Sequence, residues 1–350
     1  MRIAVTGGGT GGHIYPMATV AQYLQKHHGA EILYIGNENE FFPDKRLASY
    51  FALPFSGIPS RGMEGGRPIH FLWKNIQGVV RARKILKEFQ PDIVFSTGGF
   101  VSFPVVTAAS QLHIPYILHE QNTVMGKVNR LASKKALCIL HTFPIYQTKQ
   151  AVVTGNPVRF TEKLENEGEN VLFLGGSGGS LALNEAGVQF SLENPEVPVI
   201  IQTGKTLYEK TKAYAEAEGV KGNLTLVPYK DDLMDLYKEA KLIVTRSGSG
   251  SIFEIANLGI PSIFIPLPNS AEDHQKRNAL FFTQENAALM VEQDSNFQEV
   301  LNESILKLWN SEENREELTT NLEKLAVRNS EELIAKQLVN IYTEQNKQQS

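Results

Sequence analysis

The sequence predicts an α/β protein built from two Rossmann-like halves. Short apolar runs alternate with helical patterns along most of its 350 residues. Many of these runs end in glycine-rich or polar loops that open the next helical pattern, which is the arrangement of a βαβ unit. A polar stretch without apolar periodicity, Phe160–Asn170, divides the series in two and is interpreted as a linker. We therefore expect domains at residues 1–160 and 161–335, followed by a C-terminal helix, 336–350, that packs back on the first domain.

Composition and charge narrow the class of protein. The chain is 42% hydrophobic and 21% charged, with a formal net charge of -4, so overall charge gives no support to nucleic-acid binding. Its one cysteine, Cys138, rules out a disulfide framework and is interpreted as a small buried apolar residue. No apolar run reaches the roughly 18 residues of a membrane span, and Met1–Thr6 is too short for a signal peptide. We expect a cytosolic protein, at most peripheral to a membrane.

The first strand, Arg2–Thr6, runs into the loop GGGTGGHIYP. Three of its glycines satisfy G-x-G-x-x-G, so a nicotinamide-binding fold is an alternative. That fingerprint needs an acid after the second strand, and Ile32–Ile35 is followed by only a loose match, Gly-Asn-Glu. His13 stands where this loop enters the helix. A titratable side chain at that position indicates chemistry, with a helix-capping histidine as the alternative.

The segment Phe71–Phe89 is predicted to be a helix with two distinct faces. Trp73 lies on one stripe with Lys84 and Lys87, and a basic face carrying an aromatic side chain suits an anionic membrane surface. An ordinary solvated helix face is the alternative. A neighbouring stripe is predicted to face the core through Leu72, Ile76, Val79, Leu86 and Phe89.

Polar residues follow two later strands of the first half. Asp92–Ser96 leads into the loop Thr-Gly-Gly-Phe, which begins at Thr97 and ends at Phe100, and Pro115–Leu118 leads into His-Glu-Gln-Asn, which contains Glu120 and Asn122. The carboxyl ends of parallel strands meet at one edge of a sheet, so these side chains are predicted to share a binding edge with His13. A purely structural histidine–glutamate pair is the alternative.

The second half repeats the pattern, most clearly in its last unit. The strand Leu242–Thr245 enters the loop Ser247–Ser251, and the helix that follows carries Glu254. Small residues let backbone N–H groups approach a phosphate, the helix N-terminus adds a favourable field, and Glu254 is placed to take two vicinal ribose hydroxyls. A glycine-rich turn followed by a solvated helix is the alternative. The sequence contains no D-x-D, a motif whose two aspartates commonly hold a diphosphate through a metal ion, so no metal site is expected. Helix termini, hydroxyls and arginine are expected to hold a diphosphate instead.

Seven motifs in order resemble one family. They span residues 8 to 279 and read GGTGGHIYP, STGGFVSFP, PYILHEQN, TGNPVR, GGSGG, RSGSGSIFE and HQKRNA. Together they resemble the MurG family of GT-B glycosyltransferases, whose two Rossmann-like domains face a cleft. The resemblance implies an inverting transfer of N-acetylglucosamine from UDP-N-acetylglucosamine to undecaprenyl-pyrophosphoryl-muramoyl-pentapeptide in bacterial peptidoglycan synthesis. It implies no cofactor, and a peripheral position at the anionic cytoplasmic face of the cell membrane. Another GT-B enzyme, or a UDP-sugar epimerase on a soluble substrate, is the alternative.

The resemblance also implies roles for individual residues, with the acceptor on the first domain and the UDP-sugar on the second. His13 is the candidate general base. The donor-binding set is Thr10, Gly11, Gly12, Asn122, Arg159, Ser177, Lys230, Ser249, Gly250, Ser251, Ile252, Phe253, Glu254 and Gln275. The acceptor and membrane side is represented by Trp73, Lys84, Lys87, Phe100, Glu120 and Asn129. Gly178 and Phe100 depart from the family's usual glutamine and tyrosine, so the amide and the hydroxyl of those side chains are absent from these two loops.

Overall fold

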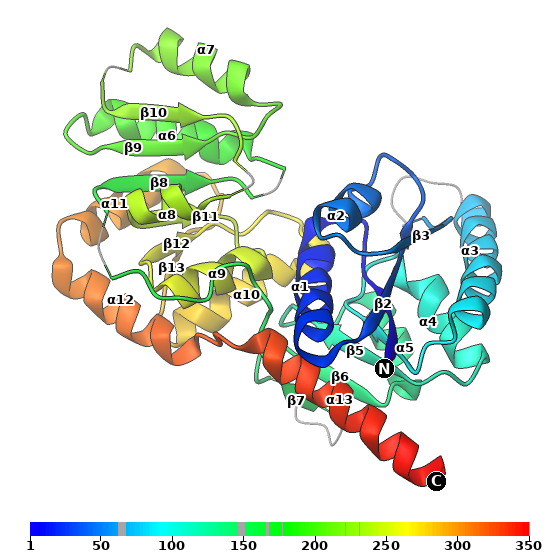
Figure 1. Ribbon diagram of the computed structural model, residues 1–350. Helices are drawn as coiled ribbons and strands as arrows, with labels where there is room; N and C mark the ends of the chain where they lie inside the picture. The colour runs from blue at the N-terminus through cyan, green and yellow to red at the C-terminus, as the bar shows by residue number, and fades with distance from the viewer. Residues whose placement is uncertain are drawn as a thin grey trace. The chain divides into compact units, whose positions relative to one another are not determined.

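A computed structural model gives the fold of the chain (Figure 1). It describes residues 1–61, 68–145, 151–165, 168–176, 178–220, 222–230 and 232–349. The chain forms two compact units, one of residues 1–159 with 329–350 and the other of residues 160–328. The return to the first unit therefore comes at residue 329, before the expected boundary at 336.

The first unit holds a seven-stranded sheet in the order β3-β2-β1-β4-β5-β6-β7, parallel at each described pairing. Its strands are β1 (Arg2–Thr6), β2 (Glu31–Asn37), β3 (Phe55–Ile58), β4 (Ile93–Ser96), β5 (Tyr116–Glu120), β6 (Cys138–His141) and β7 (Ala151–Val153). Its helices are α1 (Gly11–His28), α2 (Asp44–Tyr50), α3 (Pro68–Phe89), α4 (Ser102–Gln111), α5 (Lys127–Ala132), the 3-10 turn η1 (Ser133–Lys135) and α13 (Ser330–Gln349).

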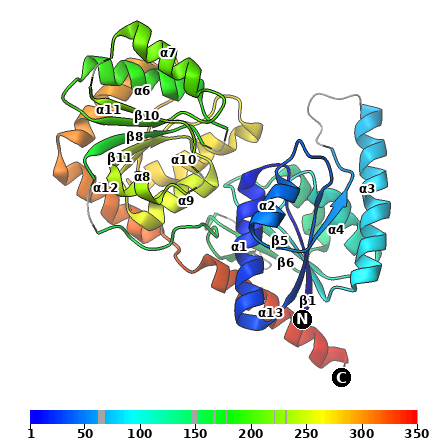
Figure 2. The same ribbon diagram turned by 45° about the horizontal axis from the view of Figure 1, so that its top comes forward.

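Helices cover both faces of this sheet, as the doubly wound pattern requires. One apolar core joins the sheet to α1, α2 and α13, and a second joins the opposite face to α3 and α4. Figure 2 shows α1 and α3 on opposite sides of the strands. Ile334, Ala335 and Leu338 of α13 are buried in the core that includes α1. Cys138 is buried in the same core, as the sequence predicted.

The predicted core face of α3 is partly wrong. Leu72 and Ile76 are 59% and 47% exposed, whereas Ala82 and Leu86 are buried. Gly78 determines which stripe turns inward, because a Cβ there would lie 2.4 Å from a backbone oxygen of the preceding loop and 3.0 Å from a proline of α4. The side of the helix that carries Gly78 therefore packs against α4, and the apolar residues Leu72 and Ile76 on the other stripe remain exposed.

The second unit repeats the topology with six parallel strands in the order β10-β9-β8-β11-β12-β13. The strands are β8 (Asn170–Leu174), β9 (Val199–Gln202), β10 (Leu224–Val227), β11 (Ala240–Thr245), β12 (Ser262–Phe264) and β13 (Leu289–Met290). The helices are α6 (Leu181–Glu193), α7 (Tyr208–Glu218), α8 (Met234–Glu239), α9 (Ser249–Leu258), the 3-10 turn η2 (Ala271–Asp273), α10 (His274–Gln284), α11 (Phe297–Trp309) and α12 (Glu312–Leu325).

The stretch interpreted as a linker is largely part of this second unit. The Phe160 ring packs edge-on against Tyr237, with centroids 5.7 Å apart, and the N–H of Leu164 donates 3.0 Å to the carbonyl of Leu258. The crossing between units therefore lies at residues 159 and 160, at the start of the predicted linker.

Candidate functional site

In both sheets all described pairings are parallel, and the order in which successive strands are added reverses beside the first strand of the unit. In doubly wound sheets, ligands bind outside the carboxyl ends of the strands at this switch point. The switch point lies between β1 and β4 in the first unit and between β8 and β11 in the second. Each donor-binding candidate that the structure describes follows the carboxyl end of a strand. Ser177 lies outside the described residues, and Trp73, Lys84 and Lys87 lie elsewhere, on α3.

The buried carboxylate of Asp44 holds the glycine loop that follows β1. Asp44 accepts hydrogen bonds from the N–H groups of Gly9 and Asn37, at 3.1 and 2.9 Å, and from the Tyr34 hydroxyl at 3.0 Å. Burial, and then the charge of Asp44, raise the pKa of Tyr34, so its hydroxyl stays a donor. This fixed support keeps the N-terminal end of α1 in place for Thr10, Gly11 and Gly12.

His13 lies in the first turn of α1, half-buried, with one ring nitrogen held by two acceptors. Nδ1 is 3.0 Å from the carbonyl oxygen of Thr97 and 3.1 Å from Oε1 of Gln121. Thr97 is also bonded to this turn in the other direction, since its hydroxyl donates 2.7 Å to the His13 carbonyl. The loops after β1, β4 and β5 therefore meet at His13, as the sequence predicted for a shared edge.

Gly99 lets the loop after β4 approach His13 closely. Its φ is +80°, and a Cβ there would stand 2.5 Å from the Gly8 carbonyl oxygen and 2.9 Å from the His13 ring. Only glycine fits this conformation and this spacing. Phe100 follows and covers Gly9, with its ring 5.1 Å from that of Phe42. Phe100 thus builds the wall of this loop through packing.

Glu120 holds the loop that follows β5. It is 2% exposed, and its carboxylate accepts from the N–H groups of Asn122 and Gly126 at 3.1 and 2.9 Å. The side-chain amides of Asn122 and Asn129 donate to it at 3.4 and 2.9 Å. Four N–H donors occupy the lone pairs of both carboxylate oxygens and leave none directed at a substrate hydroxyl. Glu120 and Asn129 therefore shape the loop that presents Asn122.

Arg159 lies close to the N-terminal part of α1. Its guanidinium carbon is 5.1 Å from the centre of the Tyr15 ring, a distance typical of a cation–π contact. A helix N-terminus already favours an anion, and Arg159 adds a fixed positive charge near it. Both features favour an anion at this end of α1.

In the second unit, α9 begins directly after the loop at the end of β11. Its first helical hydrogen bond runs from the Ile252 N–H to the Gly248 carbonyl, so the N–H groups of Gly250 and Ser251 lie ahead of the helical ladder. A Cβ added at Gly248 or Gly250 would meet nothing within 4 Å, which leaves open space beside these donors. This is the geometry of a phosphate site at a helix N-terminus. Ser249, Ile252 and Phe253 are buried and anchor it.

Glu254 and Gln275 each present one fixed group. Oε2 of Glu254 accepts 3.1 Å from the Tyr237 hydroxyl, and both residues are buried. Oε1 of Gln275 accepts 2.9 Å from the Leu267 N–H, which turns its amide nitrogen away from that backbone contact.

The carbonyl of Lys230 accepts 3.2 Å from Gln202, while its ammonium lies 3.6 Å from Asp235.

Sequence reasoning missed Arg246, which immediately follows β11. It is 8% exposed and donates to the Ile265 carbonyl at 3.2 Å, to Gln293 at 2.6 Å and to the Ser180 hydroxyl at 2.8 Å. Burial lowers the pKa of its guanidinium to about 10, so it remains charged at neutral pH. Ser180 caps α6, so Arg246 joins the two loops of the switch point. Its position between a strand and a glycine loop was the available signal.

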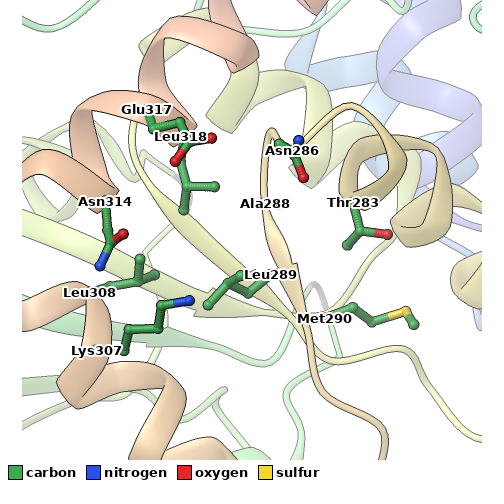
Figure 3. Close-up of a pocket in the computed structure, with 10 residues that line it drawn as sticks. All are labelled: Thr283, Asn286, Ala288, Leu289, Met290, Lys307, Leu308, Asn314, Glu317 and Leu318. Atoms are coloured by element: carbon green, nitrogen blue, oxygen red, sulfur yellow. The ribbon is translucent and has the colours of Figure 1, made fainter.

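A pocket elsewhere in this unit takes no part in the candidate site. It has a volume of about 350 Å³ and lies among α10, β13, α11 and α12, where Figure 3 shows the side chains that line it. None of the sequence-predicted site residues lines it.

Among the residues that the structure describes, no group of three or more His, Cys, Asp or Glu side chains is arranged to hold a metal ion. Over the same ranges, no helix is long and apolar enough to cross a membrane.

Two family models match the chain in the order of its units. Residues 3–141 match the glycosyltransferase family 28 N-terminal domain, and residues 170–338 match the glycosyltransferase family 28 C-terminal domain. The chain belongs to glycosyltransferase family 28. The first match ends with the last residue of β6 and the second begins with the first residue of β8, so the two together cover all the described strands except β7 and the first residue of β1.

Full-length relatives of this family 28 chain carry one enzyme name. The UDP-N-acetylglucosamine--N-acetylmuramyl-(pentapeptide) pyrophosphoryl-undecaprenol N-acetylglucosamine transferase of Bacillus licheniformis is 34% identical over 93% of this chain and 95% of its own. Its Bacillus subtilis counterpart is 33% identical over 93% and 96%. Acinetobacter baumannii MurG matches the structure with a TM-score of 0.80 at 29% identity, over 97% and 99% of the chains. The predicted GT-B fold is confirmed.

More distant structures share the fold alone. The UDP-GlcNAc 2-epimerase from Neisseria meningitidis matches with a TM-score of 0.69 at 16% identity, over 97% of this chain. Identity at that level does not extend from architecture to chemistry. The epimerase alternative therefore gains nothing from this likeness beyond the two-domain fold.

Proposed function

We propose that this chain transfers N-acetylglucosamine from UDP-N-acetylglucosamine to N-acetylmuramyl-(pentapeptide) pyrophosphoryl-undecaprenol, with inversion at the anomeric carbon. The observation that carries the proposal is identity of 33% and 34% to transferases of that name over almost their whole length. The product is the disaccharide-bearing lipid precursor of peptidoglycan. Family 28 membership and the GT-B fold support the reaction class, and the site geometry supports roles for individual residues.

His13 acts as the general base in this proposal. Both groups that contact Nδ1 are acceptors, so a neutral ring carries its proton there and leaves the lone pair on Nε2. Nε2 takes the proton of the acceptor's sugar hydroxyl as its oxygen bonds to the anomeric carbon. The bond to UDP breaks, and its electron pair leaves on the diphosphate. The four N–H donors on Glu120 argue against the alternative in which Glu120 takes this proton.

The donor is held without a metal ion. The N–H groups at the start of α9 face the diphosphate, whose charge grows as UDP leaves, and pre-aimed donors of this kind stabilise a transition state. Glu254 binds the ribose hydroxyls, Gln275 binds the sugar, and the backbone at Lys230 contacts the base. Arg159, Ser177, Asn122 and the segment Thr10–Gly12 complete the donor side.

We assign the membrane contact to α3. Trp73, Ile76 and Val80 are 59%, 47% and 65% exposed and follow one another at helical spacing, which is unusual for a helix that covers a soluble sheet. Lys84 and Lys87 continue this stripe and, with Val80, line one surface hollow of about 550 Å³. An apolar stripe that passes into lysines suits an anionic leaflet. A polyprenyl-linked acceptor places the reaction at such a surface, on the cytoplasmic side.

The test is UDP release with defined acceptors. Purified protein is incubated with UDP-N-acetylglucosamine and a short-chain lipid-linked muramoyl-pentapeptide, and product is identified by mass spectrometry. We expect disaccharide product and one UDP per transfer. UDP release without the muramoyl acceptor, or formation of a 2-epimer, would favour the epimerase reading. Transfer to a soluble sugar but not to the muramoyl lipid would favour another GT-B reaction.

A further inference from the structure

An unbroken chain of polar contacts runs from His13 to the loop after β7. Nδ1 of His13 is 3.1 Å from Oε1 of Gln121, and Nε2 of Gln121 is 3.0 Å from Nδ1 of His119. Nε2 of His119 is 3.0 Å from the carbonyl oxygen of Gly155. Gln121 is 2% exposed and His119 is fully buried, so the chain is shielded from water. The sequence motif HEQN contains both residues, but the proposed reaction assigns a role to neither.

The orientation of the Gln121 amide follows from a backbone contact. Its Nε2 also lies 3.2 Å from the carbonyl oxygen of His119, which can only accept a hydrogen bond. The nitrogen must therefore face His119, because an amide oxygen there would oppose that carbonyl. One amide hydrogen serves the carbonyl and the other serves Nδ1 of His119. Oε1 is left to face His13, where it can only accept.

The tautomers of both histidines follow from these partners. His119 accepts at Nδ1 from Gln121, so its proton is on Nε2, where the Gly155 carbonyl accepts it. His13 has only acceptors at Nδ1, the Thr97 carbonyl and Gln121 Oε1, so its proton is on Nδ1. The two neutral rings therefore carry opposite tautomers, and only that assignment satisfies each contact.

We propose that Gln121 is a positioning residue that transmits the fixed orientation of buried His119 to His13, holding His13 in the Nδ1–H tautomer with Nε2 free for the acceptor. The assignment of Nε2 as the reacting atom rests on the proposed function, whereas the tautomers do not. Thr97 supplies the second acceptor through its backbone carbonyl, which belongs to the loop after β4. Gln121 bonds both the candidate base and His119, and so joins His13 to the β5 and β7 ends of the sheet.

Burial of His119 keeps this arrangement in place. Desolvation lowers the pKa of His119 to about 4, so its ring is neutral across the working range of a cytosolic enzyme. A protonated ring would bring an N–H against the amide N–H₂ of Gln121 and turn the amide round. The amide oxygen would then leave His13, so a neutral His119 is a condition for the orientation of Gln121.

The first experiment reads the tautomers directly, with no substrate present. Long-range 1H–15N correlation spectra of the full chain with 15N-labelled histidine distinguish protonated from unprotonated ring nitrogens, and His13→Gln and His119→Gln assign two of the eight histidines. We expect a protonated Nδ1 in His13 and a protonated Nε2 in His119. The same tautomer in both rings would overturn the proposal whatever the protein's activity.

The second experiment distinguishes the contribution of Gln121 to the His13 tautomer from that of Thr97. Gln121→Met keeps the volume but removes both contacts, so His13 should shift towards a mixture of tautomers and kcat should fall by about 10-fold or more, with KM for the donor little changed. Unchanged His13 signals in Gln121→Met would mean that Thr97 suffices and that Gln121 has no positioning role. Gln121→Glu keeps an acceptor towards His13, so it should retain the His13 tautomer and alter only the His119 signals.

Thr142→Val is the matched control. The Thr142 hydroxyl donates 3.3 Å to the Gly155 carbonyl that also accepts from His119. This variant therefore removes a neighbouring hydrogen bond but leaves the contacts among His13, Gln121, His119 and Gly155 intact. Both tautomers and the turnover should stay as in the unaltered protein. Correct tautomers in a protein that does not transfer N-acetylglucosamine would contradict the proposed function alone. Normal transfer with the wrong tautomers would contradict the role of Gln121 alone.

Discussion

The hydroxyl of Tyr237, on α8, donates a hydrogen bond of 3.1 Å to Oε2 of Glu254, on α9. Both side chains are buried, so the contact holds the carboxylate in one orientation beside the N-terminal turn of α9. A carboxylate fixed in this way can meet two vicinal hydroxyls without first losing side-chain entropy. In the donor site proposed above, Tyr237 would thus orient the carboxylate that meets the ribose.

We expect Glu254→Ala to weaken binding of every uridine nucleotide, UDP included, by roughly 10- to 100-fold, because hydrogen bonds to a charged acceptor are lost. Tyr237→Phe should weaken UDP by a smaller factor, since it leaves the carboxylate in place but frees its orientation. Isothermal titration calorimetry with UDP measures both. Unchanged UDP affinity in Glu254→Ala would remove the residue from the ribose site.

Gln275→Ala should leave UDP affinity unchanged and reduce the preference for UDP-N-acetylglucosamine over its C4 epimer by about 10-fold. The Leu267 N–H holds the amide oxygen of Gln275, so its nitrogen is already oriented when the sugar binds. The ratio of kcat/KM for the two donors gives the discrimination. Gln284→Ala, at an exposed glutamine on the same helix, should change neither quantity. A Gln275→Ala enzyme with unaltered discrimination would contradict the assignment.

The βα loops were predictable because their signal is local. Each predicted strand is an apolar run next to a glycine-rich or polar loop, and β1 lies where the pattern placed it, at Arg2–Thr6. The chain order of such units, together with the seven motifs, was enough for the two-domain fold. The short strands β3 and β7 were not predicted, because few of their residues are fully buried and the apolar signal is correspondingly weak.

The contacts within the site were not predictable from local pattern. His13 and Gln121 are 108 positions apart, and nothing near either residue indicates that they meet. The face of α3 was also misassigned, since apolar residues occupy two stripes and periodicity cannot say which one is buried. Gly78 decides the matter through the close approach of α4, a tertiary effect. Roles that came from the resemblance, such as that of Asn122, remain predictions.

Stability should fall on acidification because His119 is buried as a neutral ring. Its pKa is about 4 in the folded protein, below the usual 6.5, so the unfolded chain binds more protons between those values. The contribution is fully present above about pH 6.5 and is lost as pH falls towards 4, at about 1 kcal/mol per pH unit. Urea unfolding from pH 7 to pH 5 should show a smaller slope in His119→Gln. Equal slopes in the two proteins would show that His119 does not titrate in this way.

Trp73→Ala combined with Lys84→Glu and Lys87→Glu should release the protein from anionic vesicles. The changes remove an exposed aromatic and reverse two charges on one stripe of α3. Co-sedimentation with phosphatidylglycerol vesicles at low and high salt measures binding, which should weaken with salt in the unaltered protein. Activity on a short-chain soluble acceptor should survive, because α3 packs on one face of the sheet through Ala82 and Leu86, whereas His13 is held by the loops after β4 and β5.

Lys210→Glu with Lys212→Glu is the control for charge in the vesicle assay. Lys212 forms a surface pair with Glu216 on α7, four residues apart, as Lys84 does with Glu88 on α3. The control makes the same total charge change in the second unit and should leave vesicle binding almost unaltered. If the α3 variant and this control weaken vesicle binding equally, the attraction to the vesicles follows net charge. If neither does, α3 is only a solvated face.

His13→Gln should cut turnover by roughly 10²- to 10⁴-fold, the range for a positioned general base. Glutamine can still donate a hydrogen bond towards Thr97, so the loops after β1 and β4 should remain joined. Its amide has no basic nitrogen, however, and cannot take the acceptor's proton. Donor affinity should change little, because the nucleotide contacts assigned to the second unit do not involve this residue. Single-turnover measurements with saturating donor isolate the chemical step from binding.

The pH profile decides between a base and a residue that only positions the phosphate. If His13 takes the proton, the acidic limb of kcat in the unaltered enzyme reports its protonation, and that limb should disappear in His13→Gln. His13→Ala should be equally slow, which would show that lost basicity and not altered hydrogen bonding is responsible. A His13→Gln enzyme that keeps most of its turnover with an unmoved acidic limb would assign the proton to another group. Glu120 would remain a poor candidate even then, because four N–H groups already hold its carboxylate.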